Sequence, residues 1–346
     1  MYYVHRYLRL TLTYALIMGV VIAVLPYIYY GPAWYVISSE ADTCKTYWWR
    51  HLLYINTLTK DNHEDTCMGV TWYLVCDMIF HWFAPTVFYP MFFLWKKFGH
   101  VASLTWWTLV TGAFTAGVCY INWTTKQPPV SVGMMQGLAT DYTYHVDLYN
   151  APWARFQPYL VGVLLGYALH HLRKKELKID FLLNILLWQA AFLAAFAVVY
   201  GTYDARVTGE ISLFSATMYN TFQRLAWSFS LAWVVFSCVK GFGGIINDFL
   251  SWSAFAPLSK LTYCCYLIHF NIIAMVGAST LSSFASDFAI WSIVMYVIAI
   301  LSISLCIAAL FTLCFEMPFT RVETLLIGSL LGALMGRIYY DQGSSE

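Results

Sequence analysis

Residues 288–315 read FAIWSIVMYVIAILSISLCIAALFTLCF, a stretch of 28 residues without a charged side chain. A helix needs about 20 mostly apolar residues to cross the hydrocarbon core of a bilayer. This stretch is long enough to do so, and it predicts that the chain is built into a membrane.

The composition of the whole chain agrees with this stretch. Of 346 residues, 60% are hydrophobic and 11% are charged, and the mean hydropathy is +0.62. Soluble proteins are about 45–50% apolar and about 25% charged. The composition therefore excludes an ordinary soluble protein, a disordered chain, a collagen and a coiled coil. The formal net charge is +1, so no basic surplus predicts a nucleic-acid partner, and membrane lipids are the expected surroundings.

Eight apolar segments are predicted to span the membrane. They cover roughly residues 11–30, 69–94, 101–121, 158–172, 179–200, 215–239, 261–281 and 288–315. A further run, 324–335, has only about 12 residues, which suits a re-entrant or interfacial piece. We predict an all-α, polytopic membrane protein with one membrane domain over residues 1–324, followed by a short apolar piece and polar tail over residues 325–346.

The basic residues between these segments predict the orientation. Most of them fall in alternate connections and at the two ends of the chain: Arg6, Arg9, Lys96, Lys97, Arg173, Lys174, Lys175, Lys178, Lys240, Lys260, Arg321 and Arg337. Connections rich in Lys and Arg stay in the cytosol. We therefore expect both termini in the cytosol, and the connections 31–68 and 122–157 on the outer side, of a plasma membrane or endomembrane.

Two features of the outer connections fit this orientation. Asn122 begins the sequon Asn-Trp-Thr, so Asn122 is a candidate for glycosylation, with a chance sequon as the alternative. Cys44 and Cys67 flank a polar stretch on the oxidising side, where we expect a disulfide rather than two free thiols. Between them, Trp48 and Trp49 belong to a predicted amphipathic helix on the outer leaflet.

Ionisable residues inside apolar segments are costly, so they mark candidate sites. Asp77 and His81 are four residues apart and share a helix face, where a carboxylate raises the basicity of an imidazole. The pair fits either a general base or a hydrogen bond that holds helices together. Arg224 needs a counter-charge, for which Asp77 is the candidate, and it fits a functional residue or a structural salt bridge equally. His269 fits a packed hydrogen-bonding side chain or a catalytic one.

Arg6 and Arg9 share a helix face at the cytosolic end of the first apolar segment. They fit a topology signal in contact with lipid phosphates, or a site for the phosphates of an anionic cofactor. The nine cysteines contain no Cys-x-x-Cys pair, and no His/Cys cluster has zinc spacing. We therefore predict no metal site.

Several motifs resemble the acyltransferase-3 family, in its animal "nose resistant to fluoxetine"-like branch. They occur in the family's order: YYVHRYLRLTLTYAL (2–16), WWRHLLYINTL (48–58), CMGVTWYLVCDM (67–78), PWARFQPYLVGVLLGY (152–167), LSWSAFAPLSKLTYCCYLIHF (250–270) and FEMPFTRVE (315–323). The resemblance runs from about residue 2 to residue 324. It implies a membrane enzyme that moves an acyl group from cytosolic acyl-CoA to a lipid or small-molecule acceptor.

The resemblance also assigns roles to residues of this chain. The family's paired arginines match Arg6 and Arg9, which implies that they handle acyl-CoA. Its aspartate after Trp-Tyr-Leu matches Asp77, and its Arg-x-x-Trp matches Arg224. Its Tyr-Leu-x-His matches His269, and its Glu-x-Pro matches Glu316. These four residues are the expected catalytic set, whereas His81 stands at a position where the family has an aromatic residue.

The chain departs from the family most at its front. The family begins with two further spans, whose first carries an arginine and a histidine regarded as the catalytic base. The printed chain lacks them, so a fragment, a mispredicted gene start and an inactive paralogue are all alternatives, and we expect little transfer from this chain alone. The competing hypotheses are a non-catalytic lipid or small-molecule transport protein on the same scaffold and an inert fragment.

Overall fold

A computed structural model describes residues 2–28, 31–32, 34–59, 67–129, 144–279, 290–322 and 324–325. Within these residues every regular element is helical and no strand occurs, which confirms the all-α class. The chain divides into two compact units. Unit 1 comprises Met1–Asn56, Asp61–Thr71 and Ser253–Glu346, and unit 2 comprises Thr57–Lys60 and Trp72–Trp252. We describe each unit by itself.

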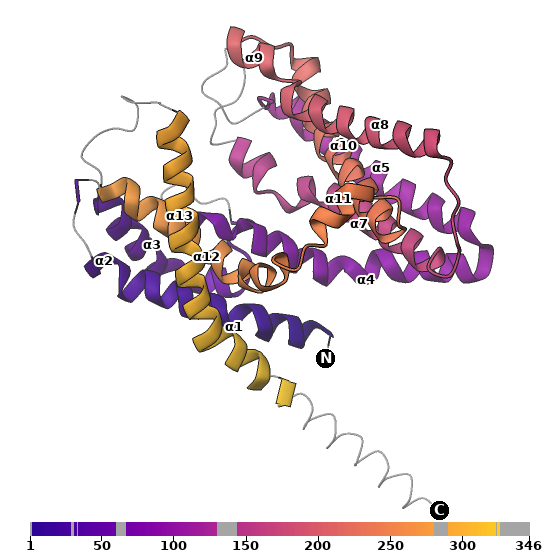
Figure 1. The fold of residues 1–346 in the computed structure, drawn as a ribbon. Helices are drawn as coiled ribbons and strands as arrows, with labels where there is room; N and C mark the ends of the chain where they lie inside the picture. Colours follow the sequence, from indigo (N-terminus) through magenta and orange to yellow (C-terminus); the bar gives the residue numbers. More distant parts are fainter. Residues whose placement is uncertain are drawn as a thin grey trace, which may run out of the picture. The chain divides into compact units, whose positions relative to one another are not determined.

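Unit 1 joins the two ends of the sequence (Figure 1). Its elements are α1 (Tyr2–Ala23), α2 (Leu25–Ile28), α3 (Trp34–Leu52), the 3₁₀-helix η2 (Gly69–Thr71), α12 (Phe255–Ser279), α13 (Ile290–Phe311) and the π-helix η4 (Thr312–Glu316). Helix α1 packs against α3 and α12, and α12 packs along α13. Tyr14, Ile17, Met18 and Val21 of α1 are buried, and their three- and four-residue spacing forms one apolar face.

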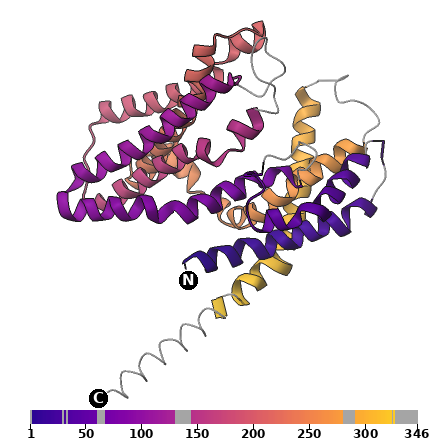
Figure 2. The ribbon, with the colours of Figure 1, turned by 180° about the vertical axis from the view of Figure 1, so that it is seen from behind.

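Unit 2 is a bundle in which α4, α5, α7 and α10 pack together, with α8 lying against α10 (Figure 2). Its elements are α4 (Trp72–Phe98), α5 (His100–Thr125), the π-helix η3 (His145–Tyr149), α7 (Pro152–His171), α8 (Phe181–Tyr200), α9 (Tyr203–Thr208), α10 (Leu213–Val239) and α11 (Gly244–Leu250). At its core Trp107 donates from Nε1 to the Leu160 carbonyl at 2.7 Å, which ties α5 to α7. Gly99 alone separates α4 from α5, and its φ of 85° lies in the left-handed region that glycine adopts without strain.

Seven of the described helices are long and apolar enough to cross a membrane: Tyr2–Ala23, Gly69–Phe98, His100–Thr125, Phe181–Thr208, Leu213–Val239, Phe255–Gly277 and Ile290–Val322. They correspond to seven of the eight predicted spans, and the difference is α7. Helix α7 has 20 residues and carries Arg155, Gln157, His170 and His171, which lower its apolar character. The predicted interfacial run 324–335 lies outside the described residues except for its first two positions.

Helix α8 shows that the surface of unit 2 needs an apolar solvent. None of its residues is buried, although its sequence, FLLNILLWQAAFLAAFAVVY, is almost wholly apolar. A helix that is apolar on every side is stable only when it is surrounded by protein or lipid. Together with the other long apolar helices, α8 identifies an integral, multi-pass membrane protein.

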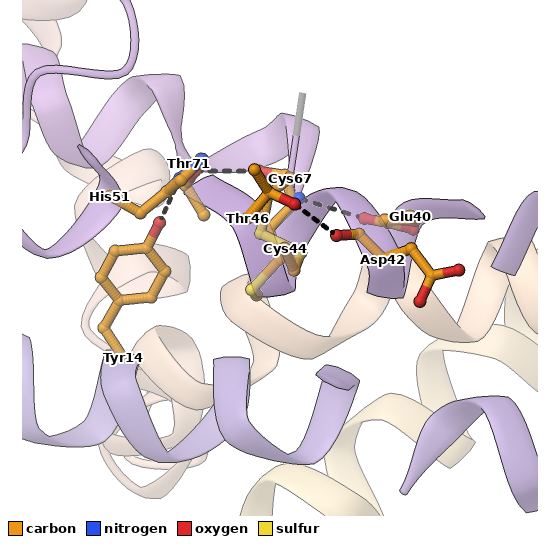
Figure 3. Close-up of a disulfide and its surroundings, with 9 residues drawn as sticks. Tyr14, Glu40, Asp42, Cys44, Thr46, His51, Cys67 and Thr71 are labelled. Carbon is orange, nitrogen blue, oxygen red and sulfur yellow. Dashed lines mark hydrogen bonds between the residues drawn. A yellow bond between two sulfur atoms is a disulfide. The ribbon is translucent and has the colours of Figure 1, made fainter. Parts of the chain in front are cut away.

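The segment predicted to lie on the outer leaflet is the 19-residue helix α3. Its Trp48 and Trp49 are 48% and 42% exposed, as expected for side chains that rest on a membrane surface. The predicted disulfide between Cys44 and Cys67 is present in the structure, with the two Cα atoms 4.8 Å apart (Figure 3). It fastens α3 to the short segment that leads into η2. Beside it, the backbone N–H of Met68 donates to Glu40 Oε1 at 3.1 Å.

Candidate functional site

In unit 1, His269 lies on α12 and its imidazole has a fixed orientation. Its Nδ1 is 2.7 Å from the carbonyl oxygen of Tyr266, one turn earlier on the same helix. A carbonyl oxygen only accepts hydrogen bonds, so Nδ1 must carry the proton. In the neutral ring the lone pair is then on Nε2. A half-buried imidazole with its tautomer set in this way has the geometry of a general base.

Two tyrosines hold α12 in place around His269. Tyr263 donates to the carbonyl of Leu10 in α1 at 2.7 Å. Tyr266 donates to the carbonyl of Val70 in η2. The two tyrosines are one helical turn apart and bind two different elements, α1 and η2. Together the two bonds fix the position of α12 and its rotation about the helix axis within unit 1.

Glu316 ends the π-helix η4, and one of its oxygens is already engaged. Cys264 Sγ of α12 donates to Glu316 Oε2 at 3.1 Å, and Thr312 Oγ1 donates to the same oxygen at 3.2 Å. A π-helix places side chains differently from an α-helix and occurs frequently at functional positions. Glu316 is thereby held against α12, the helix that carries His269.

Arg6 and Arg9 lie near the start of α1, where Arg6 is half-buried and Arg9 is exposed. Arg9 immediately precedes Leu10, whose carbonyl binds Tyr263. His269 is six residues beyond Tyr263, about 9 Å of helix rise. From the sequence, we expected His269 nine residues into its helix. Helix α12 begins at Phe255 rather than 261, so His269 is the fifteenth residue of the helix and lies about 21 Å from its start.

His51 of α3, which no sequence pattern singles out, is only 3% exposed. Its Nδ1 is 2.8 Å from the hydroxyl of Tyr14 and 3.3 Å from Thr71 Oγ1, so α3, α1 and η2 meet at one ring (Figure 3). Thr11 and Tyr54 extend this polar contact with hydroxyls 3.1 Å apart. No local spacing signals this role, because Tyr14 and His51 are 37 residues apart and both sit in ordinary amphipathic helices.

We expect α3 to loosen on acidification because of His51. Burial, followed by the positive charge of Arg50, lowers the pKa of His51 from 6.5 to about 4. Between these values the folded state keeps the ring neutral while the unfolded segment binds a proton, so stability is full above pH 6.5 and falls as the pH drops to 4. The loss is about 3 kcal/mol at most. Burial also raises the pKa of Glu40, which opposes this loss.

Hydrogen exchange of the α3 amides, corrected for the intrinsic rate, measures this effect. Protection should fall by up to about two orders of magnitude between pH 6.5 and 4, and His51→Gln should flatten the profile. The variant Glu40→Gln removes the opposing carboxyl and should steepen it. The same acid response in His51→Gln as in the unchanged protein would contradict this assignment.

In unit 2, Arg224 of α10 is buried, with 9% of its surface exposed. Its Nη2 donates to the carbonyl of Leu148 in η3 at 3.3 Å. We predicted Asp77 as its counter-charge, but within the described residues Arg224 makes no ion pair. A backbone carbonyl of the π-helix takes that place, because η3 reaches the level of Arg224 in the bundle. Asp77 and His81 lie one turn apart on α4, as predicted.

Asn122, the predicted glycosylation site, is fully buried at the end of α5. Its Nδ2 donates to the Val118 carbonyl at 2.7 Å, and its Oδ1 accepts from Asn220 Nδ2 at 3.0 Å. A glycan needs an exposed amide, so the folded structure does not accommodate one here. Asn122 is instead a hydrogen-bonding link between α5 and α10.

The predicted site residues are thus divided between the units. Arg6, Arg9, His269 and Glu316 belong to unit 1, and Asp77 and Arg224 belong to unit 2. Among the residues that the structure describes, no group of three His, Cys, Asp or Glu side chains is placed to hold a metal ion.

These features define a multi-pass membrane protein that carries an imidazole of fixed tautomer in a long apolar helix, and comparison with known proteins gives its family. The chain belongs to the acyltransferase-3 family, whose family model, described as an acyltransferase domain, matches residues 1–313. The chain is 30% identical over 335 residues to "Nose resistant to fluoxetine protein 6" of Caenorhabditis elegans, covering 95% of this chain and 40% of that protein. It is 25% identical over 244 residues to "Regulator of hypoxia-inducible factor 1" of the same organism, covering 68% of this chain and 46% of that protein.

The chain therefore spans less than half the length of these two relatives. No solved structure matches it. The family membership confirms the resemblance read from the motifs and makes this an acyltransferase-like membrane protein.

Proposed function

We propose that the protein transfers an acyl group, other than an aminoacyl group, from acyl-CoA to a hydroxyl of a lipid or small-molecule acceptor. The observation that supports this most is the bond between His269 Nδ1 and the Tyr266 carbonyl, which leaves the Nε2 lone pair for proton transfer. The fixed tautomer of His269 makes this side chain our candidate for the general base.

In the proposed reaction, Nε2 of His269 takes the proton of the acceptor hydroxyl as its oxygen attacks the thioester carbonyl. The carbon–sulfur bond then breaks, and the leaving CoA thiolate takes the proton back from the imidazolium. The products are an acylated acceptor and free CoA, and the histidine is restored.

The donor is proposed to enter at the start of α1. Arg6 and Arg9 supply two guanidinium groups, which form charge-assisted, bidentate hydrogen bonds with phosphates. His269 lies about 9 Å of helix rise beyond Tyr263, which contacts the residue next to Arg9. A thioester arm held by its phosphates at the arginines would extend along α1 and α12 toward this depth.

Photolabelling of the purified protein with a photoreactive acyl-CoA tests the donor site. We expect Arg6→Ala plus Arg9→Ala to weaken labelling about 10- to 100-fold, because hydrogen bonds to charged groups contribute about 1.5–3 kcal/mol each. The matched control is Lys96→Ala plus Lys97→Ala, an exposed basic pair at the end of α4. Unchanged labelling in the arginine variant, or an equal loss in the lysine variant, would place the donor elsewhere.

A further inference from the structure

Three side chains from three helices of unit 2 converge on one turn of backbone. Arg224 of α10 donates to the carbonyl of Leu148 at 3.3 Å, and Arg155 Nε of α7 donates to that of Tyr149 at 2.9 Å. Cys76 Sγ of α4 lies 3.6 Å from the carbonyl of Asn150. These are consecutive carbonyls at the end of η3, so the two guanidinium groups are brought to the same place.

Arg224 is not satisfied by these contacts. A guanidinium has five N–H donors, and among the residues that the structure describes none accepts a hydrogen bond from the buried Nη1 of Arg224. A buried charge is strongly unfavourable unless it is paired and hydrogen-bonded. Since one carbonyl contact at 3.3 Å is a weak substitute, the site favours an additional acceptor at Nη1.

Arg155 is held between two aromatic rings, and among the described residues its only hydrogen bond uses Nε rather than the outer Nη edge. Its guanidinium carbon lies 4.7 Å from the ring centroid of Trp72 and 4.7 Å from that of Tyr149, which fixes the plane of the group. Its one described hydrogen bond uses Nε. A guanidinium fixed by aromatic stacking presents its two Nη groups to an oxyanion in the bidentate manner.

The positive charges of the two arginines act on a shared neighbour. Burial raises the pKa of Tyr144, while the positive charges of Arg224 and then Arg155 oppose that rise, so both act on the same hydroxyl.

An apolar groove of about 310 Å³ adjoins this region. It is lined by Ala113, Phe114, Gly117, Val118, Ile121 and Trp153. Trp153 is two residues from Arg155, and its indole Nε1 donates to the carbonyl of Asp147 in η3 at 3.1 Å. Val118 and Trp153 pack in one cluster with Leu148, whose carbonyl binds Arg224. A charged end and an apolar groove therefore lie next to each other.

We propose that Arg155 and Arg224 bind the anionic group, phosphate or carboxylate, of a lipid acceptor whose hydrocarbon chain occupies this groove. The inference rests on the proposed function, in which Arg6 and Arg9 already receive the phosphates of the donor. The connection that precedes η3 belongs to the predicted outer side, so an anionic acceptor would enter from the face opposite to acyl-CoA.

Binding of oleoyl lysophosphatidic acid to the protein in neutral-lipid nanodiscs tests the proposal. We expect Arg155→Gln to weaken binding about 10-fold or more and the double variant with Arg224→Gln to abolish it. Binding of monooleoylglycerol, a neutral lipid of equal chain length, should be unchanged. Arg155→Gln alone keeps the test informative if loss of the buried Arg224 prevents folding, since Arg155 is only half-buried.

The remaining outcomes separate the sources of the anion. If inorganic phosphate binds the site as tightly as lysophosphatidic acid does, the hydrocarbon chain contributes nothing and the lipid part of the proposal is overturned. Unaltered lysophosphatidic acid binding in Arg155→Gln would overturn the site. Acyl-CoA photolabelling should be the same in Arg155→Gln as in the unchanged protein. If the proposed function is wrong, the labelling experiment shows it; if this lipid site is wrong, the lipid-binding experiment shows it.

Discussion

Replacing His269 with alanine is expected to lower acyl transfer by about 10²- to 10⁴-fold, the usual contribution of a general base. Transfer is measured as free CoA released from acyl-CoA in the presence of an acceptor. Acyl-CoA photolabelling should change by less than about twofold, because the donor phosphates are assigned to Arg6 and Arg9 rather than to the imidazole.

The reason lies in the tautomer. The Tyr266 carbonyl accepts the Nδ1 proton of His269 at 2.7 Å, so Nε2 is the only ring atom left to take a proton. Alanine removes the base and leaves the Tyr266 carbonyl without this donor. Helix α12 itself should persist, because Tyr263 and Tyr266 bind Leu10 and Val70 through their own hydroxyls.

Asparagine at position 269 is the matched control. Its amide N–H₂ reaches the place of Nδ1 and restores the bond to the Tyr266 carbonyl, but it supplies no base. His269→Asn should therefore be as inactive as His269→Ala. Recovery of transfer in His269→Asn would show that the side chain only supports the helix. Absence of transfer from the unchanged protein would count against the proposed function itself and favour a transport role.

Much of this fold follows from the hydrophobic pattern, because a bilayer accepts only backbone that satisfies its own hydrogen bonds. That constraint made apolar segments such as 288–315 readable as helices. The ends of the helices, and which helices are apolar enough to span, were harder to predict. Helix α12 starts six residues earlier than expected. The residues Phe255-Ala-Pro-Leu form its first turn, although this apolar stretch is too short to be recognised as part of the span. Helix α7 was predicted as a span from its apolar half, but its charged and histidine-bearing turns make it less apolar than the other seven.

In the candidate site, too, some residues could be predicted from the sequence and others could not. His269 and Arg224 could be singled out because ionisable residues in apolar helices are rare. Their hydrogen-bond partners could not be predicted. The Leu148 carbonyl lies 76 residues from Arg224, and every residue has a backbone carbonyl, so the sequence does not indicate which one binds the arginine. Arg155 was missed because it stands at the polar start of a helix, where an arginine is unremarkable until Trp72 and Tyr149 are seen to cover it. The burial of Asn122 could not be predicted from its sequon, because a motif states nothing about burial.

Removing the disulfide with Cys44→Ser plus Cys67→Ser is expected to destabilise the docking of α3 on α1 by roughly 3 kcal/mol. This is the loop-closure term for the 23-residue separation of the two cysteines. The crosslink limits how far α3 can move away from α1. Met68 directly follows Cys67, so the hydrogen bond from its backbone N–H to Glu40 of α3 also depends on the crosslink. Without the crosslink, α3 is held by its packing against α1 and α12 and by hydrogen bonds such as those of His51 with Tyr14 and Thr71.

Hydrogen exchange at pH 7 should show this as a loss of about 100-fold in the protection of the α3 amides, with the core of unit 2 unchanged. Cys306→Ser, which alters a free and exposed cysteine of α13, is the matched control and should leave α3 as it was. Because His51 is neutral at pH 7, the effect of the bridge is measured there without the proton-linked term. Full protection of α3 in the double serine variant would mean that the non-covalent contacts of α3, and not the crosslink, keep this helix in place.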